Sequence, residues 1–226
     1  LGSLAEKGSV LLPPTQEPWK PRPDRIFALL RLWVRIILLS VVDTRRYRRI
    51  GFITAPLRWT VMKITKQLVL KFTLICGPLV LASYVYGVSH VENPMEFWGV
   101  IPQSWRVYII PFMFIAALGF IIYWYVIFFQ FDDISFESLR WPWKVSDGNG
   151  ATRLLIAYAL ILIPSALWIE STIFHLENDF SWTPVLVVGT LFLTSIGNVM
   201  LGLLAFSSYR DGVTGSSLMI AGAVML

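Results

Sequence analysis

The chain has 226 residues, of which 56% are hydrophobic and 15% aromatic, and its formal net charge is +5. Residues 107–129 carry no charge, and as a helix they would extend about 34 Å, enough to cross a bilayer core of about 30 Å. This composition excludes a soluble globular domain. The single cysteine, Cys76, excludes an intramolecular disulfide and a zinc site built from several thiolates of this chain.

The first 24 residues contain five prolines, which disfavour a helix and favour an extended chain. We therefore expect a proline-rich extended arm over residues 1–24. A disordered tail fits this pattern, and so does a segment that lies along a partner subunit with Trp19 as an anchor. The charged, proline-rich start lacks the apolar region of a cleavable secretory signal.

Residues 25–50 predict a basic amphipathic helix on the membrane surface. Arg31 and Arg35 are four positions apart and share a helix face, and their charges would be costly in hydrocarbon. A spanning helix and a packed soluble helix are the alternatives. Each cation near the surface contributes about 1 kcal/mol to the attraction of anionic headgroups. The predicted ligands of phospholipid headgroups are Arg31, Arg35, Arg45, Arg46, Arg48 and Arg49.

Residues 51–226 predict a transmembrane helical bundle. Its first helix is expected to follow Pro56, with a basic half that leaves the membrane. A partial fifth apolar segment begins near Val213 and is too short to cross as it stands. The predicted fold class is therefore all-α, a polytopic helical membrane protein with a basic surface helix before the bundle. The four spans are expected at about 57–88, 107–130, 153–174 and 184–207.

The polar connection 131–150 carries three carboxylates, Asp132, Asp133 and Glu137, a composition that invites comparison with a metal site. Their spacing lacks the glycine and the closing glutamate of a calcium-binding loop, so we expect no metal. No cofactor other than bound phospholipid is expected. The Trp-Pro-Trp sequence at 141–143 is typical of an interfacial anchor before the next span.

Cationic segments alternate with cation-free segments along the chain. Residues 20–71 hold 13 Lys and Arg, whereas the connections 89–104 and 175–183 hold none. The connection 131–150 carries Arg140 and Lys144, and the turn 208–213 carries Arg210. The positive-inside rule predicts that the N-terminus and these two cation-bearing connections lie on the cytoplasmic or matrix side.

Glu170 and Asn198 are the polar residues expected within the spans, where an ionisable group is a functional candidate. Ser195 and Gly202 share the helix face of Asn198, and small residues also accompany Glu170. We therefore expect the third and fourth spans to pack antiparallel through these small faces. A structural Glu170, satisfied near the outer interface, is the expectation. A proton relay between Glu170 and His175, one turn further along, is the alternative.

The sequence contains no nucleophile elbow, phosphate-binding loop, dinucleotide fingerprint or metalloprotease motif. We expect a non-catalytic accessory or structural subunit of a larger membrane complex, with other membrane subunits and anionic phospholipids as partners and no nucleic acid. The mitochondrial inner membrane (a complex of respiratory-chain or ATP-synthase type) is favoured over the endoplasmic reticulum and a plastid membrane. Two hypotheses compete: a small transporter or channel with Glu170 and Asn198 lining a cavity, and a membrane enzyme acting on lipid.

Overall fold

The computed structural model describes residues 64–89, 91–99, 101–178 and 180–226. Within them all regular structure is helical, and four helices are long and apolar enough to cross a membrane, which confirms the predicted membrane bundle. The long helices are α2 (Lys66–Ser89), α3 (Gln103–Tyr125), α5 (Gly150–Asn178) and α6 (Thr183–Arg210). The π-helical turn η3 (Val126–Gln130) continues α3. The shorter elements are the 3-10 helix η2 (Pro94–Trp98), α4 (Asp133–Ser138) and α7 (Ser216–Met225).

The first span begins later than its composition predicts. The helix was expected from about residue 57, but Ile64 and Thr65 are not helical and α2 begins at Lys66. Thr65 caps this helix, because its Oγ1 accepts a hydrogen bond from Leu68 N at 3.3 Å. The extended arm at 1–24 and the surface helix at 25–50, with the six arginines predicted to bind headgroups, lie outside the described residues.

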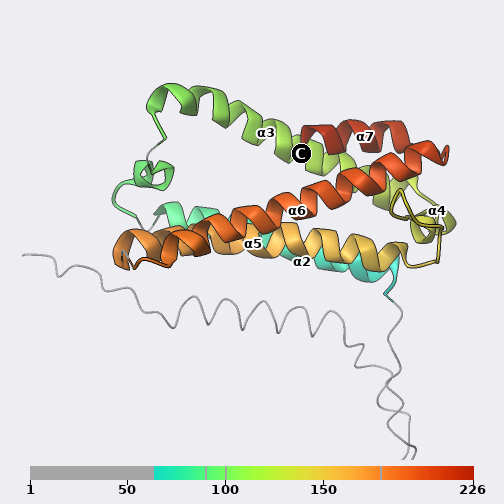
Figure 1. Cartoon of the computed structure of the whole chain (residues 1–226), viewed down its shortest axis with the longest axis horizontal. Coiled ribbons are helices and arrows are strands. Elements are labelled where there is room, and N and C mark those ends of the chain that lie inside the picture. Colours follow the sequence, from blue (N-terminus) through green and yellow to red (C-terminus); the bar gives the residue numbers. More distant parts are fainter. Residues whose placement is uncertain (1–63, 90, 100, 179) are drawn as a thin grey trace, which may run out of the picture.

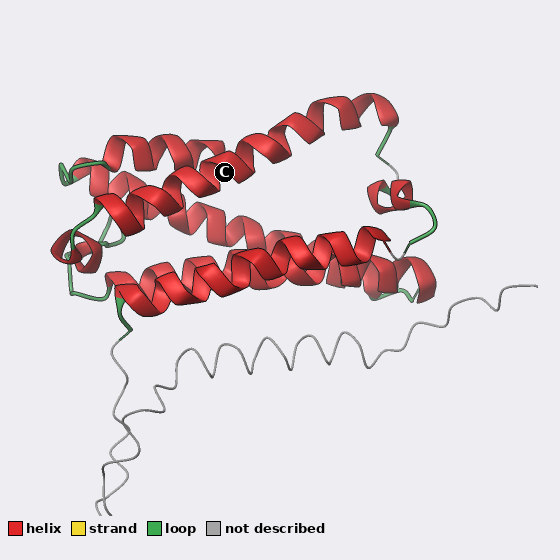
Figure 2. Ribbon diagram, turned by 180° about the vertical axis from the view of Figure 1, so that it is seen from behind, coloured by secondary structure: helices red, strands yellow, loops and turns green. Residues whose placement is uncertain are grey.

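α5 is the central helix of the bundle. Of its most apolar stretch 56% is buried, against 22% for α2 and 17% for α6. It packs against α6 and α2, whereas α3 packs mainly on α7. In two opposite views, the end of α3 that follows η2 diverges from α5 and α6 (Figures 1 and 2). The burial of side chains agrees, since no residue from 103 to 118 is buried.

Glycines mark the places where two helices approach most closely. At Gly197 of α6, a Cβ atom would lie 2.6 Å from Ile161 Cγ1 and 2.8 Å from Ala157 O, both on α5. At Gly119 of α3, a Cβ atom would lie 2.7 Å from Gly222 O of α7. The backbones touch at these points, so there is no room for a side chain.

The contact between α5 and α6 is centred on a different glycine of α6 from the expected one. A Cβ atom at Gly202 would meet nothing within 4 Å. Ser195 is exposed, and its hydroxyl donates to Leu191 O of the same helix at 3.0 Å. The antiparallel pairing of the two helices is present, but Gly197 forms the contact because it faces α5 and Gly202 does not.

Hydrogen bonds fasten the second half of α3 to its neighbours. Tyr123 Oη donates to Leu201 O of α6 at 3.1 Å, and Trp124 Nε1 donates to Thr73 Oγ1 of α2 at 2.8 Å. Such bonds are strong in a low-dielectric interior. They hold α3 only from Gly119 onward, which explains why its first half stands apart from the other helices.

Gly197→Ala should lower the free energy of unfolding by about 1–3 kcal/mol, because the new methyl group would overlap a backbone carbonyl that cannot move away. Gly202→Ala is the matched control. It meets open space and should be neutral or stabilising by up to about 1 kcal/mol through helix propensity. Both can be measured by heating detergent-solubilised protein and following the reactivity of Cys76, whose thiol is buried in the folded chain. Equal midpoints for the two variants would contradict a contact at Gly197.

Candidate functional site

Most charged side chains of the described residues gather at one end of the bundle. We call this region the polar cap and define it as residues 131–149 with Lys66, Arg153, Arg210 and Asp211. It contains α4 and lies where α2 and α5 begin and α6 ends (Figure 1). The cap brings together residues that are far apart in the sequence, so its contacts could form a site that no motif reveals.

Arg140 ties the cap to the turn that follows α6. Its Nε donates to Asp211 Oδ2 at 2.9 Å and its Nη2 donates to Asp211 Oδ1 at 2.5 Å, a bidentate pair. Its Nη1 also donates to Lys144 O at 2.6 Å. The bonds to the Asp211 carboxylate raise the pKa of the Arg140 guanidinium. Arg140 therefore fixes the path of residues 139–149, which we call the strap.

Arg153, in the first turn of α5, links the two ends of the strap. Its buried guanidinium donates through Nη1 to Leu139 O at 2.7 Å and through Nη2 to Asp147 Oδ2 at 2.6 Å. The hydrogen bond from Arg153 is the main reason that the pKa of Asp147 falls to about 2, and bonds from Asn149 also contribute. One arginine thus bonds both ends of the strap.

Lys66 and Asp132 hold the segment that enters α4. Lys66 Nζ donates to Phe131 O at 2.6 Å and lies 3.7 Å from Asp133 Oδ1. The Asp133 side chain is 91% exposed, so this ion pair contributes little. Asp132 caps α4 by accepting a hydrogen bond from Ser135 N at 2.9 Å, and its bonds with Ser135 lower its pKa. Of the three carboxylates that resemble a metal site, Asp132 therefore has a structural role at the start of α4, whereas Asp133 makes only a weak ion pair.

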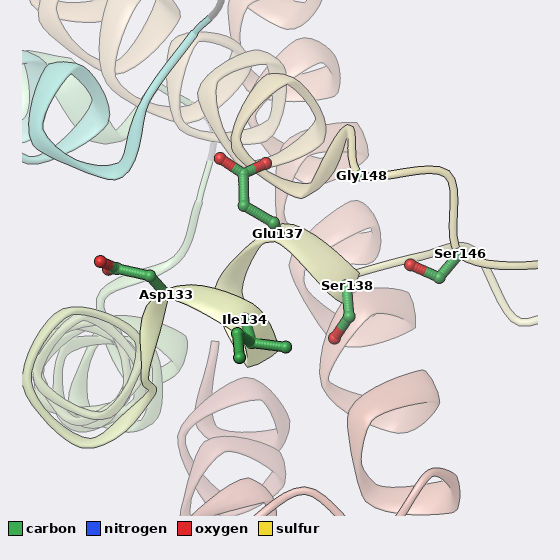
Figure 3. Close-up of a pocket in the computed structure, with 6 residues that line it drawn as sticks. All are labelled: Asp133, Ile134, Glu137, Ser138, Ser146 and Gly148. Carbon is green, nitrogen blue, oxygen red and sulfur yellow. The ribbon is translucent and has the colours of Figure 1, made fainter.

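A shallow groove of about 420 Å³ crosses the polar cap between α4 and the strap. The carboxylates of Asp133 and Glu137 point in different directions rather than toward a common point (Figure 3). Glu137 Oε2 is buried without a hydrogen-bond partner. Among the described residues, no three His, Cys, Asp or Glu side chains are placed to hold a metal ion. The groove is lined by Asp133, Ile134, Glu137, Ser138, Ser146 and Gly148.

The end of α5 and the start of α6, opposite the polar cap, are joined through His175. Its Nδ1 lies 2.7 Å from Thr183 Oγ1, and the Thr183 hydroxyl donates to Phe180 O at 2.7 Å. Because the single hydroxyl proton is used there, the imidazole Nδ1–H donates to Thr183. Glu170 is 9% exposed and has an interaction partner. A relay between Glu170 and His175 stays a prediction, since the contact shown for His175 is with Thr183.

The middle of the α5–α6 pair contains polar atoms that the sequence pattern only partly indicated. Asn198 Oδ1 is buried without a hydrogen-bond partner. One turn earlier, Thr194 Oγ1 lies 3.4 Å from Ser165 Oγ of α5. Thr194 and Asn198 are four positions apart and therefore share one helix face, so the position of Thr194 could have been predicted from that of Asn198. Asn198 and the Ser165–Thr194 contact thus belong to the interior of the bundle.

These arrangements are suited to joining helices, because the arginines bond to carboxylates and carbonyls of the same chain. The predicted headgroup ligands Arg31, Arg35, Arg45, Arg46, Arg48 and Arg49 lie outside the described residues. No family model, curated protein or solved structure matches the chain. The chemistry of the described residues is therefore the basis on which a function is inferred.

Asp147→Asn should destabilise the protein at neutral pH, and the effect should depend on pH. Because the folded-state pKa is about 2 and the ordinary value is 3.8, the carboxylate stabilises the fold fully above pH 3.8. This stabilisation is lost as the pH falls through the folded value. Thermal unfolding of wild type and variant should therefore converge below about pH 2. Asp133→Asn, at a 91% exposed side chain, is the control with little expected effect; a difference for Asp147→Asn that persists in acid would contradict the ion pair.

Proposed function

We propose that this chain is a non-catalytic accessory subunit of a larger membrane protein complex. The observation that carries the proposal is the stretch of α3 from residue 103 to residue 118, in which no side chain is buried against the described chain. Phe114, for example, is 72% exposed. Helices associate in a bilayer through packing and hydrogen bonds. A stretch of a spanning helix in which no residue is buried is suited to packing against the helices of neighbouring subunits.

The polar cap supports the non-catalytic part of the proposal. Arg140 and Arg153 each bond to a carboxylate and to a backbone carbonyl, and Lys66 bonds to a carbonyl, all within the chain. Perturbed pKa values can indicate a catalytic site, but structural ion pairs also produce them. The carboxylates at the groove diverge, so they are poorly placed to act together on one substrate (Figure 3).

We propose the mitochondrial inner membrane as the location and the matrix side for the polar cap. The support is the charge asymmetry of the chain, with 13 Lys and Arg over residues 20–71 and further cations at Arg140, Lys144 and Arg210. Anionic phospholipids are proposed partners for the same reason. The endoplasmic reticulum is the alternative membrane, where the same rule would place the cap in the cytoplasm.

A small transporter is the second candidate, and one observation favours it. Asn198 Oδ1 is a buried acceptor without a hydrogen-bond partner, and a polar group in that position inside a membrane is costly. A bound water or a passing polar substrate would satisfy it. Under this hypothesis Glu170, on the adjacent helix, would be a titrating group rather than a structural one.

The proposed orientation can be tested by labelling single cysteines in a Cys76→Ala background. Glu96→Cys, in the η2 connection, should react with a membrane-impermeant maleimide added to the outer side of the membrane. Ser146→Cys, in the strap, should react only after the membrane is opened. Both parent residues are exposed, so access rather than burial decides the result. The reverse labelling pattern would contradict the orientation.

The accessory role can be tested by affinity purification of the full chain in mild detergent, with the partners identified by mass spectrometry. Wild type and Glu170→Gln should bring down the same membrane subunits in fixed proportion. The complex should keep its turnover per assembled copy, because Gln preserves the shape and most hydrogen bonds of Glu. Any loss of stability should be about 1–3 kcal/mol, the cost of one impaired buried hydrogen bond.

Two results would contradict the accessory role. Purification of the chain without partner subunits would remove the complex from the proposal. Loss of turnover by orders of magnitude in Glu170→Gln, with assembly intact, would show that Glu170 must ionise and would favour the transporter. His175→Gln separates the relay from a role of Glu170 alone, because a relay needs both residues.

A further inference from the structure

Two apolar side chains of the strap are far more exposed than their chemistry favours. Trp143 is 68% exposed and Val145 is 87% exposed, although both lie outside the spanning helices. Lys144, between them, is also exposed. Apolar side chains left in water are unfavourable, so a surface that covers both side chains would stabilise this part of the strap.

Hydrogen bonds to the end of α6 fix the position of this patch along the length of the bundle. Arg210 is the last residue of α6, and its Nη2 donates to Pro142 O at 3.1 Å. Arg140 reaches the adjacent Asp211 through its bidentate pair. Residues 140–142 are therefore level with the end of a spanning helix. Trp143 follows directly, so it lies beside the end of a helix that is long and apolar enough to cross a membrane.

The strap holds Trp143 in one orientation. The ring of Trp143 stacks on that of Trp141 with centroids 6.1 Å apart and an interplanar angle of 13°. Trp141 in turn packs against the hydrophobic core. An indole fixed at the end of a span is typical of the aromatic belt at a membrane surface. The patch is thus pre-organised for its partner.

The two sides of the strap differ in chemistry. Ser146 and Gly148 line the groove together with Asp133 and Glu137 (Figure 3). Trp143 and Val145 are not among the residues that line it. Lys144, which lies between Trp143 and Val145 in the sequence, is exposed as well. Apolar side chains beside a free ammonium group match the boundary between acyl chains and anionic headgroups.

We propose that the strap is seated in the headgroup layer of the bilayer that the bundle spans. Trp143 and Val145 contact the upper acyl chains, and Lys144 contacts anionic headgroups. The groove side, with Ser146, faces water. This surface is independent of the accessory role, because it would anchor the chain in the bilayer whether or not partner subunits surround α3.

The test uses the full chain with Cys76→Ala, spin-labelled at Val145→Cys, in nanodiscs of phosphatidylcholine with phosphatidylglycerol. Ser146→Cys, the neighbouring position on the groove side, is the matched control. Oxygen concentrates in the acyl region and a charged nickel chelate stays in water, so collision with each reports depth. The ratio of oxygen to nickel accessibility should be several-fold higher at 145 than at 146. Replacing phosphatidylglycerol by phosphatidylcholine, or Lys144 by Gln, should lower the ratio at 145.

Three outcomes would overturn the proposal. Equal nickel accessibility at 145 and 146 would mean that the strap stands in water. Exclusion of both reagents at 145 would mean that protein, including a second copy of this chain, covers the patch. A ratio at 145 that changes neither with lipid charge nor with Lys144→Gln would exclude contact between Lys144 and anionic headgroups.

Discussion

Helix backbones touch at Gly197 and at the pair Gly119 and Gly222, and the rest of the bundle depends on these contacts. Lipid tails are as apolar as Leu or Val, so burying an apolar helix face against another helix gains little in a bilayer. Stabilisation must come from dispersion at close approach and from buried hydrogen bonds. Gly197 allows α6 to pack closely against α5, and Gly119 and Gly222 allow α7 to pack closely against α3.

The same constraint explains why the spans are so unequally covered. α5 has close neighbours on two sides, so more than half of its most apolar stretch is buried. α3 meets its partners only from Gly119 onward, and its earlier residues stay exposed. An apolar helix is stable in lipid without such partners, because all its backbone hydrogen bonds are internal. Its uncovered surface is therefore available to other subunits, as the proposed role requires.

At the polar cap a different kind of contact joins the helices. Arg140, Arg153 and Lys66 direct their donors at carboxylates and at carbonyls that have no helical partner. These bonds align the ends of α2, α5 and α6 and give the strap a fixed path. The result is a fixed polar edge at one end of the bundle. Three carboxylates of this region, Asp132, Asp133 and Glu137, invite comparison with a metal site in the sequence, and in the structure Asp132 bonds to Ser135 while Asp133 lies near Lys66.

The number, type and approximate position of the spans follow from the sequence alone. A stretch of about 20 consecutive apolar residues is long enough to cross the bilayer as a helix, and its composition does not depend on the rest of the fold. Most contacts of the candidate site could not be predicted from the sequence. Gly197 and Gly202 look alike in the chain, and only the crossing of α5 and α6 decides which one touches a neighbour. The bonds from Arg140 to Asp211 join residues 71 positions apart, and no periodicity predicts such a pair. Contacts between elements depend on how helices rotate and cross, so they were decided by the tertiary structure.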